Sequence, residues 1–190
     1  MAILEGWRST LSPLWPAGQR GDVQSVLLIL AALLLAPAPA QAAVNAAAIL
    51  ADQPPKLLSE FGFFVDARAQ KPAEGVIPYD LATPLFSDGA VKRRFVYVPH
   101  GGAARYDAVE AFDFPVGAAL IKTFAFPADY RRPDENVRLI ETRVLERQAD
   151  GWHAWAYVWN EAQSDATLKI AGARVDIATI AADGAPPPSP

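Results

Sequence analysis

The sequence has 190 residues, 52% of them hydrophobic and 20% charged, which suits one domain with a buried core. Its formal net charge of −4, with scattered Lys and Arg, excludes the basic stripe that a nucleic-acid-binding surface requires. The lack of cysteine excludes disulfides, thiolate nucleophiles, zinc–thiolate and iron–sulfur sites, and the Cys-x-x-Cys-His attachment of haem c.

Residues 1–42 have the pattern of a secretory signal peptide with a long leading segment. An eleven-residue apolar block, Val26 to Ala36, follows Arg20 and is broken by Pro37. Ala40-Gln41-Ala42 offers the small-x-small pattern that signal peptidase cleaves, so we predict a cut after Ala42. The block is shorter than the roughly 20 residues that span a bilayer. We therefore expect membrane contact only during export, and a periplasmic or secreted product.

Residues 43–66 are predicted to form a helical and then extended segment that packs on the domain. A short helix over residues 43–51 would end at Asp52 and the Pro54-Pro55 pair. Residues 66–90 are predicted to be a loop, because prolines, glycines and the pair Asp88-Gly89 punctuate them.

From residue 91 onward the dominant pattern is the period-two alternation of β-strands. The longest predicted feature is a hairpin over residues 137–159, where Asp150-Gly151 supplies a tight turn. Further strands are predicted from residue 91 and over residues 112–114, 120–126, 168–170 and 174–180. Short strands without intervening helical segments predict a mainly β domain over residues 67–180, an antiparallel β-sandwich or jelly-roll-like sheet pair. Residues 181–190 form a Pro-rich tail predicted to be disordered.

Three aromatic residues, Trp155, Tyr157 and Trp159, alternate along the return strand of that hairpin. Together with Trp152 they could form a stacking platform in a carbohydrate- or polymer-binding module. The alternative is that their rings fill the core. Their bulk favours the core, because aromatic side chains supply much of the buried area of a domain.

The two histidines, His100 and His153, are far apart in the sequence. A metal site would need both to converge with a carboxylate such as Asp88 or Asp107, because two imidazoles leave coordination incomplete. Nothing in the spacing requires this. We predict no metal site.

Glu141 and Glu161 are candidates for the acid/base pair of a glycoside hydrolase. Ion pairing of Glu141 with neighbouring arginines across strands is the simpler interpretation. A hydrolase using Asp88, Glu141 or His153 is therefore the last of three functional hypotheses, since no known spacing ties these residues together. We predict no catalytic residues.

Residues 79–94 contain two acids in a loop and a basic strand entrance. Loops on rigid scaffolds often carry function, so this stretch is a candidate ligand or partner loop. Its candidate residues are Asp80, Ser87, Asp88, Lys92 and Arg94. The alternative is an ordered loop whose aspartates bond their own backbone, with residues 92–94 pairing them.

Three segments, YDLATPLFSDGAVKRRFVYVP (79–99), FDFPVGAALIKTFAFP (112–127) and IETRVLERQADGWHAWAYVWNEAQSDATL (140–168), occur in that order. Together they resemble a family of exported bacterial di-haem c-type cytochromes, over about residues 57–178. In that family the β-rich region precedes a Cys-x-x-Cys-His segment. This sequence contains no such segment, so no haem ligand carries over, and we expect no cofactor in this chain.

The resemblance leads to the preferred functional hypothesis. It implies a non-catalytic periplasmic β-domain, truncated or stand-alone, that is linked to electron transfer and has a periplasmic redox protein as its partner. A polymer ligand is the partner in the second hypothesis, that of a carbohydrate-binding module.

Overall fold

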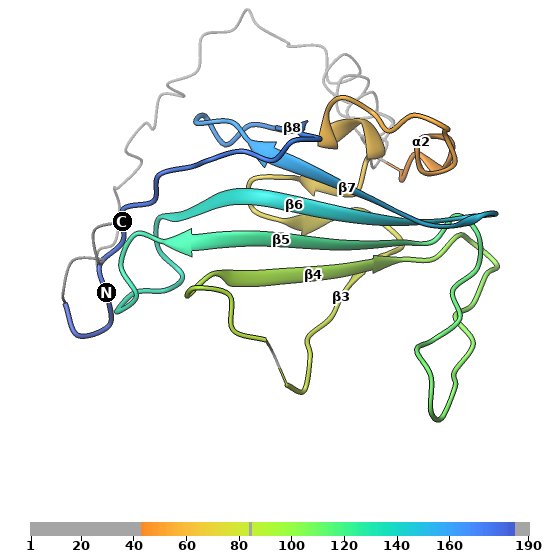
Figure 1. Ribbon diagram of the computed structural model, residues 1–190, viewed down its shortest axis with the longest axis horizontal. Coiled ribbons are helices and arrows are strands. Elements are labelled where there is room, and N and C mark those ends of the chain that lie inside the picture. The colour runs from red at the N-terminus through yellow and green to blue at the C-terminus, as the bar shows by residue number, and fades with distance from the viewer. Residues whose placement is uncertain (1–42, 84, 185–190) are drawn as a thin grey trace, which may run out of the picture. The chain divides into compact units, whose positions relative to one another are not determined.

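The computed structural model describes residues 43–83 and 85–184, which belong to one compact unit. They form a six-stranded antiparallel sheet, ordered β3-β4-β5-β6-β7-β8, and a two-stranded sheet, β1-β2 (Figure 1). The predicted mainly β fold is confirmed. The predicted signal peptide, with its cut after Ala42, and most of the predicted Pro-rich tail lie outside the described residues.

The large sheet follows chain order, so each strand pairs with the next one in the sequence. Its strands are β3 (Val76–Pro78), β4 (Val91–Tyr97), β5 (Ala119–Pro127), β6 (Val137–Gln148), β7 (Gly151–Trp159) and β8 (Ala166–Leu168). The preceding elements are the helix α2 (Ala46–Ile49), the 3₁₀ helix η1 (Leu58–Phe61), β1 (Phe64–Asp66) and β2 (Lys71–Pro72).

Alternation along β5 separates the two faces of the large sheet. Ala119, Ile121 and Ala125 are each 0% exposed on the inner face, while the residues between them are half-buried on the outer face. The register pairs Ile121 with Val144 of β6, which is also fully buried. This strict period of two is why the sequence pattern predicted the strand correctly.

The N-terminal segment covers the inner face. Ile49 of α2 and Phe61 of η1 are both 0% exposed and belong to the same apolar cluster as the sheet residues. The ring of Phe61 meets Tyr157 of β7 edge-on, with 5.8 Å between centroids. Burying a side chain of this size stabilises the fold by about 1.5–3 kcal/mol. The covering layer is thus two short helices and a two-stranded sheet.

The outer face has no such cover. Within residues 43–83 and 85–184, no helix or strand packs across it, and Figure 1 presents the large sheet with the short N-terminal elements at its back and upper edge. Its residues are those that alternate with the core, such as Lys92, Leu120 and Phe124. Two chain segments project beside this face: the loop of residues 79–90 and the arm of residues 98–118, which joins β4 to β5.

A bulge in the β5–β6 pairing alters one predicted face. Strict alternation along β6 would place Ile140 on the same face as Thr142 and Val144, but the register shifts between Phe124 and Ala125 of β5. Leu139, 2% exposed, takes the core position instead. An extra residue in one strand reverses the alternation beyond it, and simple period-two reasoning does not foresee that.

Several predicted elements differ from those observed. Residues 112–114 are not a strand; a single bridge joins Asp113 to Arg105 within the arm. Residues 174–180 make only one bridge, from Ile180 to Asp129. The strands β4 to β7 are already paired on both sides, so a further strand could add only beside β3 or β8, and neither segment pairs there. The strand expected at 168–170 is β8, two residues earlier, and the loop at 66–90 includes β2 and β3.

Candidate functional site

The predicted ligand loop ends, just before β4, in a turn that is fixed to a distant segment. Asp88 (φ +46°) and Gly89 (φ +80°) adopt left-handed backbone conformations, and the Ala90 N–H donates to the Ser87 carbonyl. The Tyr130 hydroxyl donates to the Gly89 carbonyl at 2.7 Å. Burial raises the pKa of Tyr130. Ser87 and Asp88 therefore contribute their backbone to the turn, Ser87 through its carbonyl and Asp88 through its left-handed conformation.

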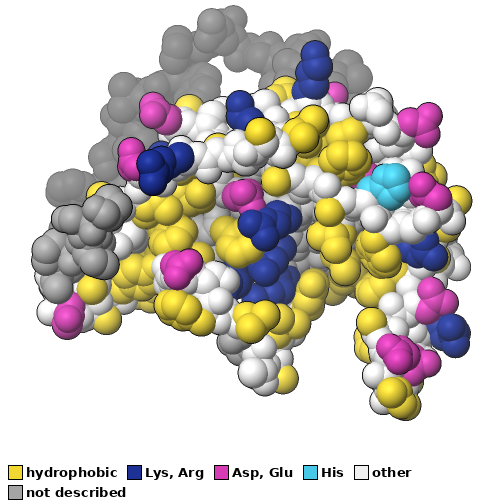
Figure 2. Space-filling model, viewed as in Figure 1, with side chains coloured by type: hydrophobic (Ala, Val, Ile, Leu, Met, Phe, Trp, Pro, Cys, Tyr) yellow, Lys and Arg dark blue, Asp and Glu magenta, His cyan; other side chains and the backbone are white. Residues whose placement is uncertain are grey.

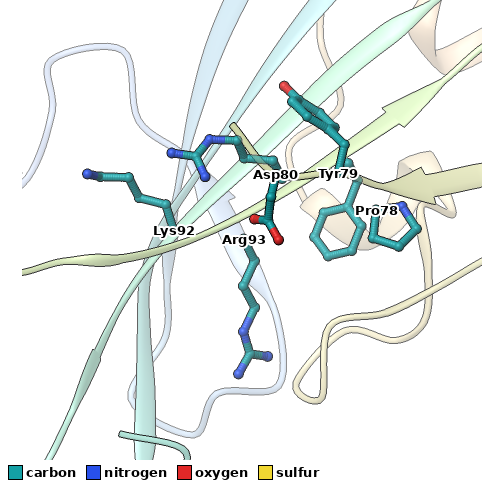
Figure 3. A pocket seen from close by; sticks show the side chains of 7 residues that line it. Pro78, Tyr79, Asp80, Lys92 and Arg93 are labelled. Atoms are coloured by element: carbon teal, nitrogen blue, oxygen red, sulfur yellow. The ribbon is translucent and has the colours of Figure 1, made fainter. Parts of the chain in front are cut away.

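The other three candidate residues of the loop lie around one cavity. Asp80, Lys92 and Arg94 line a cavity of about 440 Å³ between the start of the loop and β4 (Figure 3). Lys92 and Arg93 point to opposite sides of β4, as alternation requires. Lys92 Nζ donates to the carbonyl of Leu85 in the loop. The structure thus brings together three of the five predicted residues.

Arg94 is the least usual residue of this cavity. It is 7% exposed, yet its guanidinium makes no hydrogen bond or ion pair with any residue in the described part of the chain. Over those same residues, no ion pair links Asp80 or Asp88 to a base, so the predicted pairing of these aspartates with residues 92–94 is not observed. Arg94 therefore presents a guanidinium without a protein partner to the cavity that it lines.

Arg94 belongs to a group of cations that cross three strands. Arg94 stands opposite Lys122 of β5, and Lys122 stands opposite Arg143 of β6. Lys92 lies two residues before Arg94 on the same face. We call Lys92, Arg94, Lys122 and Arg143 the basic cluster. Figure 2 shows Lys and Arg side chains gathered at the middle of this face, with hydrophobic side chains on both sides.

The basic cluster is only partly neutralised. Arg143 donates to Glu141 Oε1, an ion pair within β6. Lys122 Nζ and the Arg143 guanidinium lie 4.6 and 4.8 Å from the centroid of the Phe124 ring, in cation–π geometry. Burial lowers the pKa of Lys122, and the nearby charges of Arg94, Lys92 and Arg143 lower it further. The four cations thus have one carboxylate, that of Glu141, as an ion-pair partner in the described structure, and it pairs with Arg143 alone.

The position of Glu141 corrects one detail of the sequence interpretation. Its ion-pair partner, Arg143, is on the same strand, two residues away, whereas a partner on a neighbouring strand was predicted. Residues two apart in a strand share a face, so this pairing is equally compatible with the sheet. Glu161 lies in the turn after β7, and its side chain is exposed.

A second, apolar cavity adjoins the first. Its volume is about 400 Å³, and its walls are Tyr79, Val96, Val98, Phe112, Phe114 and Leu120. Tyr79 lines both cavities. Phe112 and Phe114 belong to the arm. Their rings form a row that runs from Tyr106 of the arm to Trp152 of β7, with 5.7–6.5 Å between neighbouring ring centroids. The arm thereby closes one side of the apolar cavity.

The rings of Tyr157 and Trp159 do not form a surface platform, the less favoured interpretation of this strand. Tyr157 is 0% and Trp159 is 6% exposed, both on the inner face, and Trp155 is half-buried beside them. The Tyr157 hydroxyl donates to the Pro55 carbonyl at 3.0 Å, and Trp159 Nε1 donates to Thr142 Oγ1 at 3.0 Å. Burial raises the pKa of Tyr157 well above its usual range. These rings fill the core, the alternative that their bulk favoured.

The histidines serve local structure. His153 Nε2 lies 3.0 Å from Asp150 Oδ1 across the β6–β7 turn, and His100 is exposed in a turn after β4. Among residues 43–83 and 85–184, no group of three His, Cys, Asp or Glu side chains could hold a metal ion. The same residues include no helix long and apolar enough to cross a membrane.

The buried carboxyl group of Glu146 was not predicted from the sequence. Glu146 is 0% exposed; its Oε2 accepts from Trp155 Nε1 at 2.9 Å, while its Oε1 has no partner in the described structure. Burial raises its pKa, against the lowering effects of Trp155, Gln148 and His153. Its phase with Thr142 and Val144 was the signal that could have placed it inside.

Comparisons with known proteins leave the site without a precedent. No protein-family model matches the chain, and neither curated proteins nor solved structures give a significant match. The resemblance to di-haem cytochromes stays a prediction from the sequence.

Proposed function

We propose that this chain is a non-catalytic, exported binding module of a cytochrome-associated kind, which docks on a periplasmic redox protein. The supporting observation is the uncovered outer face of the large sheet, with the incompletely neutralised basic cluster at its centre. A surface of this charge is complementary to a partner that presents carboxylates. All three segments that resemble the cytochrome family contribute to the basic cluster: the first supplies Lys92 and Arg94, the second Lys122 and the third Arg143.

The surroundings of the hydrolase candidates favour a non-catalytic role. Asp88 lies in the turn that begins the basic strand, Glu141 is held by Arg143, and His153 is next to Asp150. The Glu141 and His153 side chains are thus engaged within their own segments. A glycosidase would instead need two carboxyl groups facing each other across a substrate cleft.

The carbohydrate-binding hypothesis loses its main support, because the rings of Tyr157 and Trp159 are in the core. Trp152, 42% exposed, remains outside, where it packs on Phe114 of the arm. One half-exposed ring does not make a flat platform for a sugar chain.

Docking can be tested by calorimetry with the purified full-length protein and an acidic soluble c-type cytochrome. We expect binding that weakens as salt rises, because screening reduces attraction between exposed charges. Lys122→Gln with Arg143→Gln should weaken it by about threefold or more, given roughly 0.2–1 kcal/mol per exposed pair.

The matched control is Arg68→Gln with Lys71→Gln, which removes two exposed charges from the β1–β2 layer on the opposite side. This variant should bind as the unchanged protein does. Equal loss in both variants, or binding that is insensitive to salt, would contradict docking through the outer face. Covalently attached haem in the isolated chain would contradict its assignment as a haem-free module.

A further inference from the structure

The two adjoining cavities differ sharply in chemistry, and we propose that together they bind one small amphiphile with an anionic head and an apolar tail. The head would lie at Arg94 and the tail between the sheet and the arm. The site occupies the same outer face as the proposed docking function, and so deepens it, but it requires no protein partner.

The head site is built around an arginine whose side chain is largely buried and whose guanidinium lines the cavity. Arg94 is more than nine-tenths buried, lines the first cavity, and has no hydrogen-bond or ion-pair partner in the described residues. Its planar guanidinium offers up to five N–H donors, in a geometry that matches a carboxylate, sulfate or phosphate. An anion there would supply the missing partner and would also relieve the repulsion between Arg94 and Lys122, which stand directly opposite each other.

The tail site carries no charge. All six residues that line the second cavity are aliphatic or aromatic, and the single polar group among them is the Tyr79 hydroxyl. Volumes of about 440 and 400 Å³ each fall within the range of roughly 300–1,000 Å³ of ligand pockets. An alkyl chain placed here would be removed from water by Phe112 and Phe114 of the arm.

Strand geometry puts the two sites in line. On β4, Arg94 is followed two residues later by Val96, and on β5, Lys122 is preceded two residues earlier by Leu120. The register pairs Arg94 with Lys122 and Val96 with Leu120. Charged and apolar pairs are therefore about 7 Å apart along the strands, since each residue advances the chain by about 3.4 Å. A ligand extended along the strands would meet the charge first and then the apolar walls.

The first cavity has one acidic residue among those that line it, Asp80. Asp80 is exposed, lines the first cavity, and is not ion-paired with Arg94. Its carboxylate opposes an incoming anion without neutralising the buried guanidinium. Asp80→Asn should therefore strengthen the binding of the anionic ligand, a direction of change that general loss of structure would not produce.

Titration calorimetry of the full-length protein with decanoate, below its micellar concentration, tests the site. We expect decanoate to bind at least tenfold more tightly than acetate, which lacks a tail, and than decyltrimethylammonium, which has the opposite charge. Arg94→Gln should weaken decanoate binding at least tenfold, because truncating a buried charge partner typically costs several kcal/mol. Arg68→Gln is the matched control and should bind decanoate unchanged.

Two further measurements guard against misfolding. Arg94→Gln replaces an unpaired buried charge by a neutral group, so its urea midpoint should be equal or higher. Phe112→Ala truncates a ring that is 53% exposed, and should reduce decanoate affinity toward that of acetate without altering the fold.

Equal affinity for decanoate and decyltrimethylammonium, or unchanged binding in both Arg94→Gln and Phe112→Ala, would overturn the proposal. The outcome is separable from that of the docking experiment. Loss of decanoate binding alone would remove the amphiphile site and leave salt-dependent docking of the cytochrome intact. Absence of cytochrome binding with tight decanoate binding would remove only the docking function.

Discussion

At the scale of single residues, two ionisable side chains are buried in opposite settings. Glu146 lies under the N-terminal segment, where one carboxyl oxygen accepts hydrogen bonds from Trp155 and Gln148 and the other has no partner in the described residues. Arg94 lies under the outer surface, beside a cavity. Burial favours the neutral form of the Glu146 carboxyl, which can take up a proton, whereas a guanidinium has no accessible neutral form. Only Arg94 therefore calls for an external partner.

The raised pKa of Glu146 predicts a pH dependence of stability. The folded state binds this proton more tightly than the unfolded state, so the stabilisation is complete below the unfolded pKa and is lost as pH rises through the folded pKa. Above that point an ionised, partly unsatisfied carboxylate remains in the core. The cost should be about 1–3 kcal/mol, as for other unsatisfied buried groups.

Urea unfolding at pH 5 and pH 8 measures this effect. Glu146→Gln keeps the size of the side chain and removes its titration, so the variant should lose less stability than the unchanged protein between the two pH values. Comparing the two proteins cancels the contribution of other groups, including the nearby His153. A difference between pH 5 and pH 8 that is the same in both proteins would exclude Glu146 as its source.

At the scale of elements, the loop of residues 79–90 depends on one close approach. Gly89 has φ +80°, and a Cβ atom there would lie 2.7 Å from the hydroxyl of Tyr130, which donates to the Gly89 carbonyl. Gly101, in the arm, has φ +78°, but a Cβ there would meet nothing within 4 Å. The two glycines share a backbone conformation and differ in their surroundings, so they form a matched pair.

Gly101→Ala should cost only the left-handed strain of a non-glycine residue, about 1–2 kcal/mol. Gly89→Ala should cost more, because the added methyl group also displaces the Tyr130 hydroxyl, a hydrogen bond worth roughly 0.5–1.5 kcal/mol. Thermal and urea unfolding compare the two variants. If Tyr130→Phe leaves the difference between the two alanine variants unchanged, the hydroxyl contact is not its cause.

At the scale of the whole described unit, the large sheet is covered on one face only. The core is formed by that inner face and by residues 48–63, which contribute Ile49, Leu58, Phe61 and Phe63. The outer face carries the basic cluster and the apolar cavity. This asymmetry explains why a mainly β protein without disulfides can keep a stable core and still present a broad interaction surface.

Export is a prediction for the chain as a whole. Expressed in a Gram-negative host with its natural N-terminus, the protein should appear in the periplasmic fraction, and N-terminal sequencing should begin at Ala43. Replacing Ala40 and Ala42 by arginine should leave an uncleaved, larger product, because signal peptidase requires small residues at these positions. Recovery of the unchanged protein in the cytoplasm with Met1 intact would exclude the signal peptide.

The sequence by itself determined the main strands, because period-two alternation directly reflects which side chains face the core. Residues 91–97, 119–127 and the hairpin of residues 137–159 follow that alternation closely, and Asp150-Gly151 marked the turn between β6 and β7. It also singled out the loop that carries Asp80, Lys92 and Arg94. These are local properties, set by a residue and its near neighbours in the chain.

Tertiary structure alone decided what those residues meet. Register placed Lys122 and Arg143 beside Arg94, although they are 28 or more positions away in the sequence. Phe112 and Phe114, in a predicted strand, instead line the apolar cavity. Packing on the inner face decided between the two alternatives for Tyr157 and Trp159, because their rings are buried in the core. Pairing register and the choice of covered face depend on long-range packing, which a periodic pattern does not encode.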